Sequence, residues 1–172
     1  NKAMRSAKEM YQRMWDFKFL PPGRGLWAVG TDFVETKGGA ACNNCGFVST
    51  EKIGDEGSKA FRWTMDMLML GVGIGFDTQG AEKFTVVDAK KTDQVYVIPD
   101  TREGWVVALG LVIDPFIFDQ DKLIEVYKNR LQYDPLYENV PIFEGVPNFD
   151  FSLIRKQGEP IKGFGGKASG PQ

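Results

Sequence analysis

Cys42 and Cys45 are the residues whose type and spacing suit chemistry best in this sequence. They are the two cysteines of a 172-residue chain that contains no histidine. A Cys-x-x-Cys spacing is compatible with a redox dithiol, with half of a zinc site, or with two thiols that have no chemical role. A structural zinc site needs about four nitrogen or sulfur ligands, which this chain cannot supply by itself. The redox dithiol and the two idle thiols both remain open.

The predicted elements around the cysteines do not favour a thioredoxin-like site. In that motif a strand precedes the first cysteine and a helix begins at it. Here residues 46–50, with the sequence Gly-Phe-Val-Ser-Thr, predict a short strand that starts just after Cys45. A thioredoxin-like site is therefore the weaker interpretation of the pair.

Two glycine-rich segments could bring backbone close to a ligand. Residues 71–76 read Gly-Val-Gly-Ile-Gly-Phe, which superficially resembles a dinucleotide-binding fingerprint. However, this segment follows a predicted helix and opens a predicted strand, the reverse of the Rossmann order, and no Lys-Ser or Lys-Thr follows it. Glycines that permit close packing are the favoured interpretation. Residues 163–167 could present backbone amides to phosphates or serve as a flexible connection.

Composition restricts the classes of protein. The chain is 42% hydrophobic and 26% charged, which is enough apolar material for a core, and its net charge is −2. No basic excess points to nucleic acid. No apolar run reaches the roughly 18 residues of a membrane span, and no secretory signal is visible. Two cysteines in a chain of this size favour a reducing, cytoplasmic location, with no membrane or nucleic-acid partner.

The positioning elements are predicted from hydrophobic periodicity and from breaker residues. Helices are expected at 2–18, 55–70, from Asp100 or Thr101 to near Pro115, and at 121–132; strands are expected at 46–50, 72–77, 84–87, 95–98 and 149–155; and loops are expected at 23–41 and 134–148. The apolar side chains of the first two helices and of strand 72–77 are expected in the core. Helices and strands alternate, so the fold class is α/β.

Five motifs, taken in order, resemble the monomeric, adenosylcobalamin-dependent (class II) ribonucleoside-triphosphate reductases. They are Phe-Leu-Pro-Pro-Gly-Arg-Gly-Leu-Trp at 19–27, Gly-Ala-Ala-Cys-Asn-Asn-Cys-Gly-Phe-Val-Ser-Thr at 39–50, Met-Leu-Met-Leu-Gly-Val-Gly-Ile-Gly-Phe-Asp at 67–77, Pro-Asp-Thr-Arg-Glu-Gly-Trp at 99–105, and Ile-Lys-Gly-Phe-Gly-Gly-Lys-Ala-Ser-Gly-Pro at 161–171. The resemblance implies that residues 1–172 are a fragment of one catalytic domain. Residues 1–22 would form an N-terminal helix, and 23–172 the first strands and helices of a ten-stranded α/β barrel, with 119–148 as a candidate insertion.

The resemblance also implies roles for individual residues. In the family, a thiyl radical abstracts the 3′ hydrogen of the ribose, and two further cysteines reduce the 2′ position and end as a disulfide. Cys45 occupies the Asn-Asn-Cys position of the first reducing cysteine, whose partner lies far downstream. Asn44, Gly71 and Gly73 would line the substrate pocket. Cys42 stands where the family is expected to have an apolar residue, and it is a second redox candidate whose disulfide with Cys45 would compete with turnover.

Further partners follow from the same resemblance. They are a ribonucleotide substrate, a deoxynucleotide effector, thioredoxin or a similar dithiol, and the remainder of the reductase chain. Adenosylcobalamin would be bound mainly by parts outside these residues, and no metal ligand is expected within them. We therefore expect no turnover from this chain alone. Two alternatives remain: a segment of the di-iron or glycyl-radical reductase classes, or a non-catalytic nucleotide-binding or interaction domain.

Overall fold

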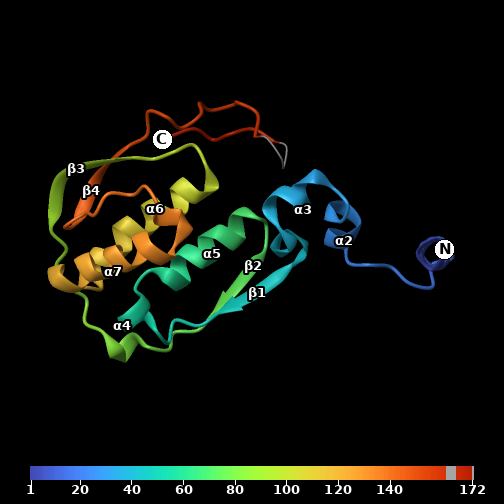
Figure 1. Ribbon diagram of the computed structural model, residues 1–172, viewed down its shortest axis with the longest axis horizontal. Coiled ribbons are helices and arrows are strands. Elements are labelled where there is room, and N and C mark those ends of the chain that lie inside the picture. Colours follow the sequence, from blue (N-terminus) through green and yellow to red (C-terminus); the bar gives the residue numbers. More distant parts are fainter. Residues whose placement is uncertain (162–165, 172) are drawn as a thin grey trace. The chain divides into compact units, whose positions relative to one another are not determined.

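The structure is a computed structural model that describes residues 1–161 and 166–171 (Figure 1). The chain divides into two compact units, Asn1–Asn44 and Cys45–Gln172. Within the described residues, no helix is both long enough and apolar enough to cross a membrane.

The first unit is helical. It contains α1 (Lys2–Trp15), α2 (Gly23–Ala28), α3 (Asp32–Lys37) and a 3-10 turn at Gly39–Cys42. The helix expected at 2–18 is confirmed, but the loop expected at 23–41 is wrong. Its glycines lower helix propensity, yet α2 is held by a tertiary contact, because Arg24 donates to the carbonyl of Ala41 at 3.2 Å. The conformation of this segment therefore does not follow from local helix propensity alone.

The apolar side chains of α1 were expected in the core, and this expectation is wrong. No residue of α1 is buried, and Trp15 is 69% exposed. The spacing correctly predicted an amphipathic helix, but burial of its apolar face requires a complementary surface. The first unit does not supply that surface.

The second unit is built from two parallel strand pairs, each joined by helices (Figure 1). In chain order its main elements are β1 (Cys45–Val48), α4 (Ile53–Glu56), α5 (Lys59–Met69), β2 (Gly73–Phe76), β3 (Lys91–Val97), α6 (Arg102–Ile113), α7 (Gln120–Tyr133) and β4 (Val146–Asp150). β1 pairs with β2, and β3 pairs with β4. Parallel pairing requires such helical crossovers, so the predicted α/β class is confirmed.

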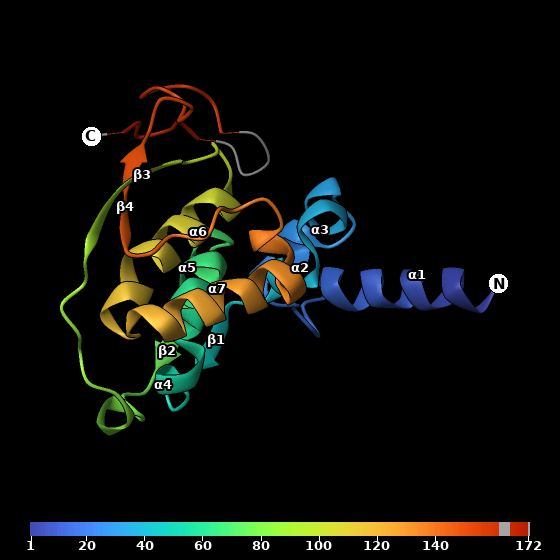
Figure 2. The ribbon, with the colours of Figure 1, turned by 60° about the vertical axis from the view of Figure 1, so that its left-hand side comes forward.

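Helix α5 and helix α6 form the middle of the second unit. α5 packs against β2 and against α6, and α6 packs against β4. Both views show this order, with the two helices between the two strand pairs (Figure 1 and Figure 2). The unit is therefore layered, and one face of the β1–β2 pair is covered by α5.

Several element boundaries differ from the predictions. The single helix expected at 55–70 is two helices, because Gly57 between them has a φ of +58°. Residues 84–87 are not a strand, and the strand expected at 149–155 lies at Val146–Asp150 instead. The loop expected at 134–148 contains a 3-10 turn at Pro135–Tyr137. Helices α6 and α7 lie where they were predicted, within one or two residues.

Two segments are less buried than their apolar sequences predicted. Phe76 of β2 is 67% exposed, and Leu68 of α5 is 53% exposed. Both belong to runs in which almost every position is apolar. Such a run indicates burial on more than one side, but the second unit covers β1 and β2 on one face. The expectation that strand 72–77 is buried is therefore wrong for this chain.

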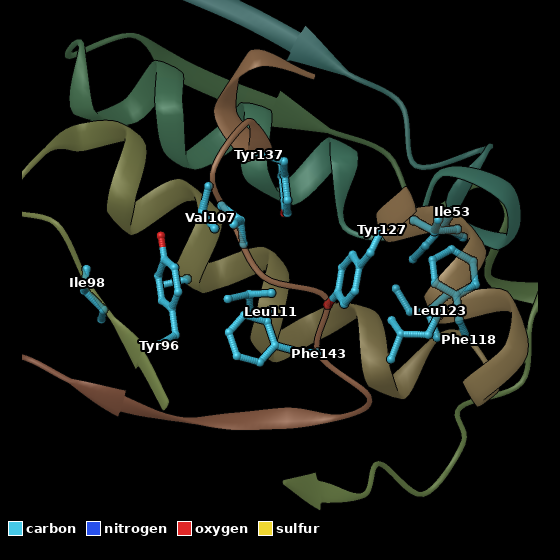
Figure 3. Close-up of a cluster of buried hydrophobic side chains, with 14 of the residues drawn as sticks. Ile53, Tyr96, Ile98, Val107, Leu111, Phe118, Leu123, Tyr127, Tyr137 and Phe143 are labelled. Carbon is cyan, nitrogen blue, oxygen red and sulfur yellow. The ribbon is translucent and has the colours of Figure 1, made fainter. Parts of the chain in front are cut away.

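The core of the second unit gathers aromatic and aliphatic side chains from α6, α7, β3 and the segment that follows α7 (Figure 3). Its largest fully buried members are Tyr127, Tyr137, Phe143, Ile98, Leu111 and Leu123. Four of these six lie between residues 119 and 148. The candidate insertion at 119–148 therefore supplies an integral part of the core.

A buried ionic cluster joins α4 and α7 to the start of α5 and the end of α6 in the second unit. The carboxylate of Asp114, which is fully buried, accepts hydrogen bonds from the Ser58 amide at 2.7 Å and from the Ser58 hydroxyl at 3.0 Å. Arg130 of α7 pairs with both oxygens of Asp114 and also donates to the carbonyl of Glu56 at 3.2 Å. Burial opposes the charged form of Arg130, but the hydrogen bonds and charge of Asp114 outweigh it and raise the pKa of Arg130. Each buried charge is thus compensated.

A second buried cation fixes α5. Arg62 is 6% exposed, and its guanidinium donates to Asp134 at 3.0 Å and lies 4.9 Å from the ring centre of Tyr137. Gly110 of α6 faces this cluster, and a side chain there would collide with Arg62 and Tyr137. These contacts hold α5 against α6 and the segment after α7.

Gly57→Ala is expected to lower the free energy of unfolding by at least about 2 kcal/mol. Gly57 has a left-handed φ of +58°, and a β-carbon there would collide with Asp114 and Phe118. Urea unfolding of the chain measures the effect. The control is Gly25→Ala in α2, where the added carbon meets open space; it should be neutral or stabilising by up to about 1 kcal/mol. Equal losses in both variants would contradict the account.

Candidate active site

Cys45 is the first residue of β1, and its thiol is free and exposed. In the parallel β1–β2 pair its Cα is in register with that of Gly73, the first residue of β2. The predicted strand next to Cys45 is therefore confirmed, although it begins at the cysteine itself. The predicted glycine-rich strand at 72–77 is the partner strand. The two motifs thus meet at one end of the strand pair.

The alternation of β1 decides which way the thiol points. Gly46 faces α5, because a β-carbon there would lie 3.2 Å from the indole of Trp63. Neighbouring strand residues point to opposite faces, so Cys45 and Phe47 lie on the face that α5 does not cover. Gly75 lies on that same face, since its β-carbon would be 3.6 Å from the Phe47 ring. The thiol therefore projects from the open face of the pair.

The glycines of β2 leave space beside this thiol. Gly73 is the register partner of Cys45, and neither it nor Gly75 carries a side chain on the open face. A ring or another backbone can therefore approach the thiol along β2. The substrate-binding role of Gly73 stays a prediction, and the geometry around it is compatible with that role.

Gly71 has a conformational role. It has a φ of +79° two residues after the end of α5, and its amide donates to the carbonyl of Leu68 at 2.8 Å. A left-handed residue at this place ends the helix and suits glycine. The predicted helix stop at Gly71 is confirmed, whereas its predicted contact with substrate stays a prediction.

Asn44 and Cys42 belong to the first unit. Asn44 is exposed and immediately precedes Cys45 in the chain. Cys42 ends the 3-10 turn at Gly39–Cys42 and is partly buried, with a free thiol. The substrate-binding role of Asn44 and the redox role of Cys42 stay predictions.

The other end of the strand pair is held by two residues that the sequence did not single out. Asp77 follows β2, and its carboxylate accepts from the Thr50 amide at 2.9 Å. The Thr50 hydroxyl donates to the carbonyl of Gln79 at 2.7 Å. The hydrogen bond from the Thr50 amide is the main cause that holds the pKa of Asp77 below its usual value. The signal was present, since Thr50 and Asp77 are the last residues of two predicted strands, and parallel strands end at a common edge.

Asp77→Asn is expected to make stability less sensitive to acid. The pKa of Asp77 is lowered in the folded chain, so its ionised form stabilises the fold above the unfolded value near 3.9. That contribution is lost as pH falls below this value and through the folded pKa. The urea midpoint of the original chain should therefore fall more steeply below about pH 4 than that of the variant. If the urea midpoints of the two chains fell in parallel as pH was lowered, the stabilising role of ionised Asp77 would be contradicted.

The described residues do not form a metal centre. In the described ranges, no group of three Cys, Asp or Glu side chains is placed to hold a metal ion, and the sequence has no histidine.

Comparisons with known proteins cover nearly the whole chain. The model of the ribonucleotide reductase alpha domain matches residues 1–31. A probable adenosylcobalamin-dependent ribonucleoside-triphosphate reductase of Dictyostelium discoideum is 40% identical over 188 residues, covering 99% of this chain and 22% of that protein. The adenosylcobalamin-dependent ribonucleoside-triphosphate reductase of Euglena gracilis is also 40% identical, over 99% of this chain and 20% of its own length. The chain thus spans about a fifth of these relatives.

A solved structure shares the fold. The crystal structure of a B-12 dependent (class II) ribonucleotide reductase matches 97% of this chain and 27% of its own chain, with a TM-score of 0.66 and 27% sequence identity. The predicted resemblance is therefore confirmed in sequence and in fold. The mixed helices and strands match part of the α/β barrel of that class.

Proposed function

We propose that this chain, which is related over nearly its whole length to adenosylcobalamin-dependent ribonucleoside-triphosphate reductases, is a segment of such an enzyme. Its role is to carry Cys45, one of two thiols that reduce a ribonucleotide to a 2′-deoxyribonucleotide. The activity belongs to the full-length enzyme. The chain contributes one strand pair of the active site.

One observation carries the assignment: the exposed thiol of Cys45 on the open face of β1, opposite a glycine of β2. Reduction of the 2′ position needs two electrons and two hydrogens. Two thiols supply them, the 2′ hydroxyl leaves as water, and the sulfurs end as a disulfide. A thiol that is accessible and flanked by glycine can meet both the ribose and a second cysteine.

The second thiol has to reach the open face. A disulfide requires Cα atoms about 4.4–6.8 Å apart. We propose that the partner of Cys45 comes from the part of the reductase outside this chain. Cys42 is the alternative partner, and a Cys42–Cys45 disulfide formed apart from the reaction would compete with turnover.

The further components are proposed on the same basis. The substrate is a ribonucleoside triphosphate, bound beside Cys45 with Asn44 and Gly73 in its pocket. A deoxynucleotide is the effector, and thioredoxin or a similar dithiol regenerates the thiols. A reducing compartment, the cytoplasm, keeps such thiols available. The full-length enzyme would use adenosylcobalamin to supply the radical, and the cofactor would be bound mainly by parts of the enzyme outside these residues.

The test is to express the complete coding region and assay the purified enzyme. With a ribonucleoside triphosphate, a dithiol and adenosylcobalamin, we expect deoxynucleotide formation, and we expect none when adenosylcobalamin is left out. Formation without adenosylcobalamin would favour the di-iron or glycyl-radical classes. Nucleotide binding without any reduction would favour the non-catalytic domain.

A further inference from the structure

Gly46 lies between Cys45 and Phe47 on the face of β1 that meets α5. A β-carbon at this position would lie 3.2 Å from Cη2 of Trp63 and 3.0 Å from Cδ1 of Ile74. Both contacts are tighter than a side chain normally tolerates. The edge of the Trp63 indole thus takes the space that a side chain at position 46 would need.

The turn of α5 that carries Trp63 is held in place by Arg62. Arg62 is buried and bound to Asp134 and the Tyr137 ring, which fixes this turn of α5. The Trp63 side chain is 37% exposed and forms part of the wall of a cavity of about 510 Å³, together with Leu136. Its inner edge meets β1, and its helix cannot retreat without breaking the Arg62 contacts.

We infer that Trp63 is a positioning residue for Cys45. Its indole fixes how closely β1 approaches α5, and this distance sets where the Cys45 thiol stands on the opposite face. The catalytic meaning of this inference rests on the proposed function. The geometric part of the inference is that the position of the Cys45 thiol depends on Trp63, and this part does not rest on the proposed function.

The two neighbours of position 46 differ in stiffness. The Cδ1 of Ile74 is the end of a flexible side chain and can rotate away at small cost. The indole of Trp63 is rigid. An alanine at position 46 would therefore push β1 away from α5, and the adjacent Cys45 would move with the strand.

The experiment uses full-length reductase and a compensating pair. Gly46→Ala is expected to lower kcat by about threefold to tenfold, because the two contacts require a shift of only a few tenths of an ångström, with KM changed by less than about twofold. The double variant with Trp63→Phe has a shorter ring at the contact, and its kcat should return to within about twofold of the original enzyme. The alkylation rate of Cys45, followed by mass spectrometry of its peptide, should change and recover in parallel.

Two controls separate Trp63 from other causes. Trp105→Phe makes the same chemical change on α6, where Trp105 contacts Phe151, and should not rescue Gly46→Ala. Ile74→Val removes the Cδ1 atom and should rescue weakly. Rescue by Ile74→Val without rescue by Trp63→Phe would overturn the inference, as would unchanged kcat and unchanged Cys45 alkylation in Gly46→Ala.

Two further measurements keep the inference testable. If Gly46→Ala does not fold, Trp63→Phe alone should still change the alkylation rate of Cys45 severalfold in a folded enzyme, and an unchanged rate would contradict the inference. Full activity in Cys45→Ser would refute the proposed function alone. The alkylation rates would then still decide whether Trp63 positions this thiol.

Discussion

Cys45→Ser in the full-length reductase is expected to lower kcat by more than about a thousandfold, or about 4 kcal/mol in the barrier. A hydroxyl has nearly the size of the thiol, but it can neither give up its hydrogen at comparable cost nor form a disulfide. Because Cys45 is exposed, the free energy of unfolding should change by less than about 0.5 kcal/mol. Deoxynucleotide formation and nucleotide affinity are the measurements, and only the first should be lost.

Cys42→Ser is the matched control, since it makes the same change three residues earlier. We expect it to keep deoxynucleotide formation within about threefold of the original enzyme, the range of context effects on a side chain outside the reaction. Loss of activity in this variant alone would make Cys42 the reducing thiol. Loss in both variants would favour the Cys42–Cys45 dithiol.

Asp114→Asn is expected to lower the free energy of unfolding by about 3–5 kcal/mol. The substitution keeps the shape but removes the charge that compensates Arg130, which is only 7% exposed and pairs with both oxygens of Asp114. An unpaired guanidinium would remain in the core beside Tyr127, whose pKa is already raised by burial. Urea unfolding of the chain, followed by circular dichroism, measures the loss.

Glu125→Gln tests whether burial of the ion pair is the cause of the large stability loss expected for Asp114→Asn. Glu125 pairs with Lys122 at 3.2 Å on the exposed side of α7, where both side chains are more than 40% exposed. Loss of this pair should cost less than about 1 kcal/mol. A loss as large as that of Asp114→Asn, or a negligible loss in Asp114→Asn, would show that the buried pair does not stabilise the second unit.

Local signals in the sequence predicted the elements that carry Cys45. β-Branched residues predicted the strand beside the thiol, and a glycine predicted the end of the helix before Gly71. The helix predicted to begin at Asp100 or Thr101 has Thr101 as its N-cap, and the Thr101 hydroxyl accepts from the Gly104 amide at 3.0 Å. Each of these features depends on residues within a few positions of one another.

Contacts between distant residues were not predictable from a single sequence. Asp114 and Ser58 meet across 56 positions, and nothing in their types marks them as partners. The fit of Trp63 against Gly46 depends on the packing of a helix on a strand, which periodicity does not describe. Burial was overestimated for β2, because an apolar run does not say which surface covers it.

The most direct test is a single turnover of the full-length reductase without external dithiol, followed by disulfide mapping. We expect substrate to convert Cys45 from a free thiol to a disulfide with a cysteine outside residues 1–172, in proportion to the deoxynucleotide formed. Cys42 should remain alkylatable throughout. Product formation with Cys45 still free would contradict the assignment of Cys45 as a substrate-reducing cysteine.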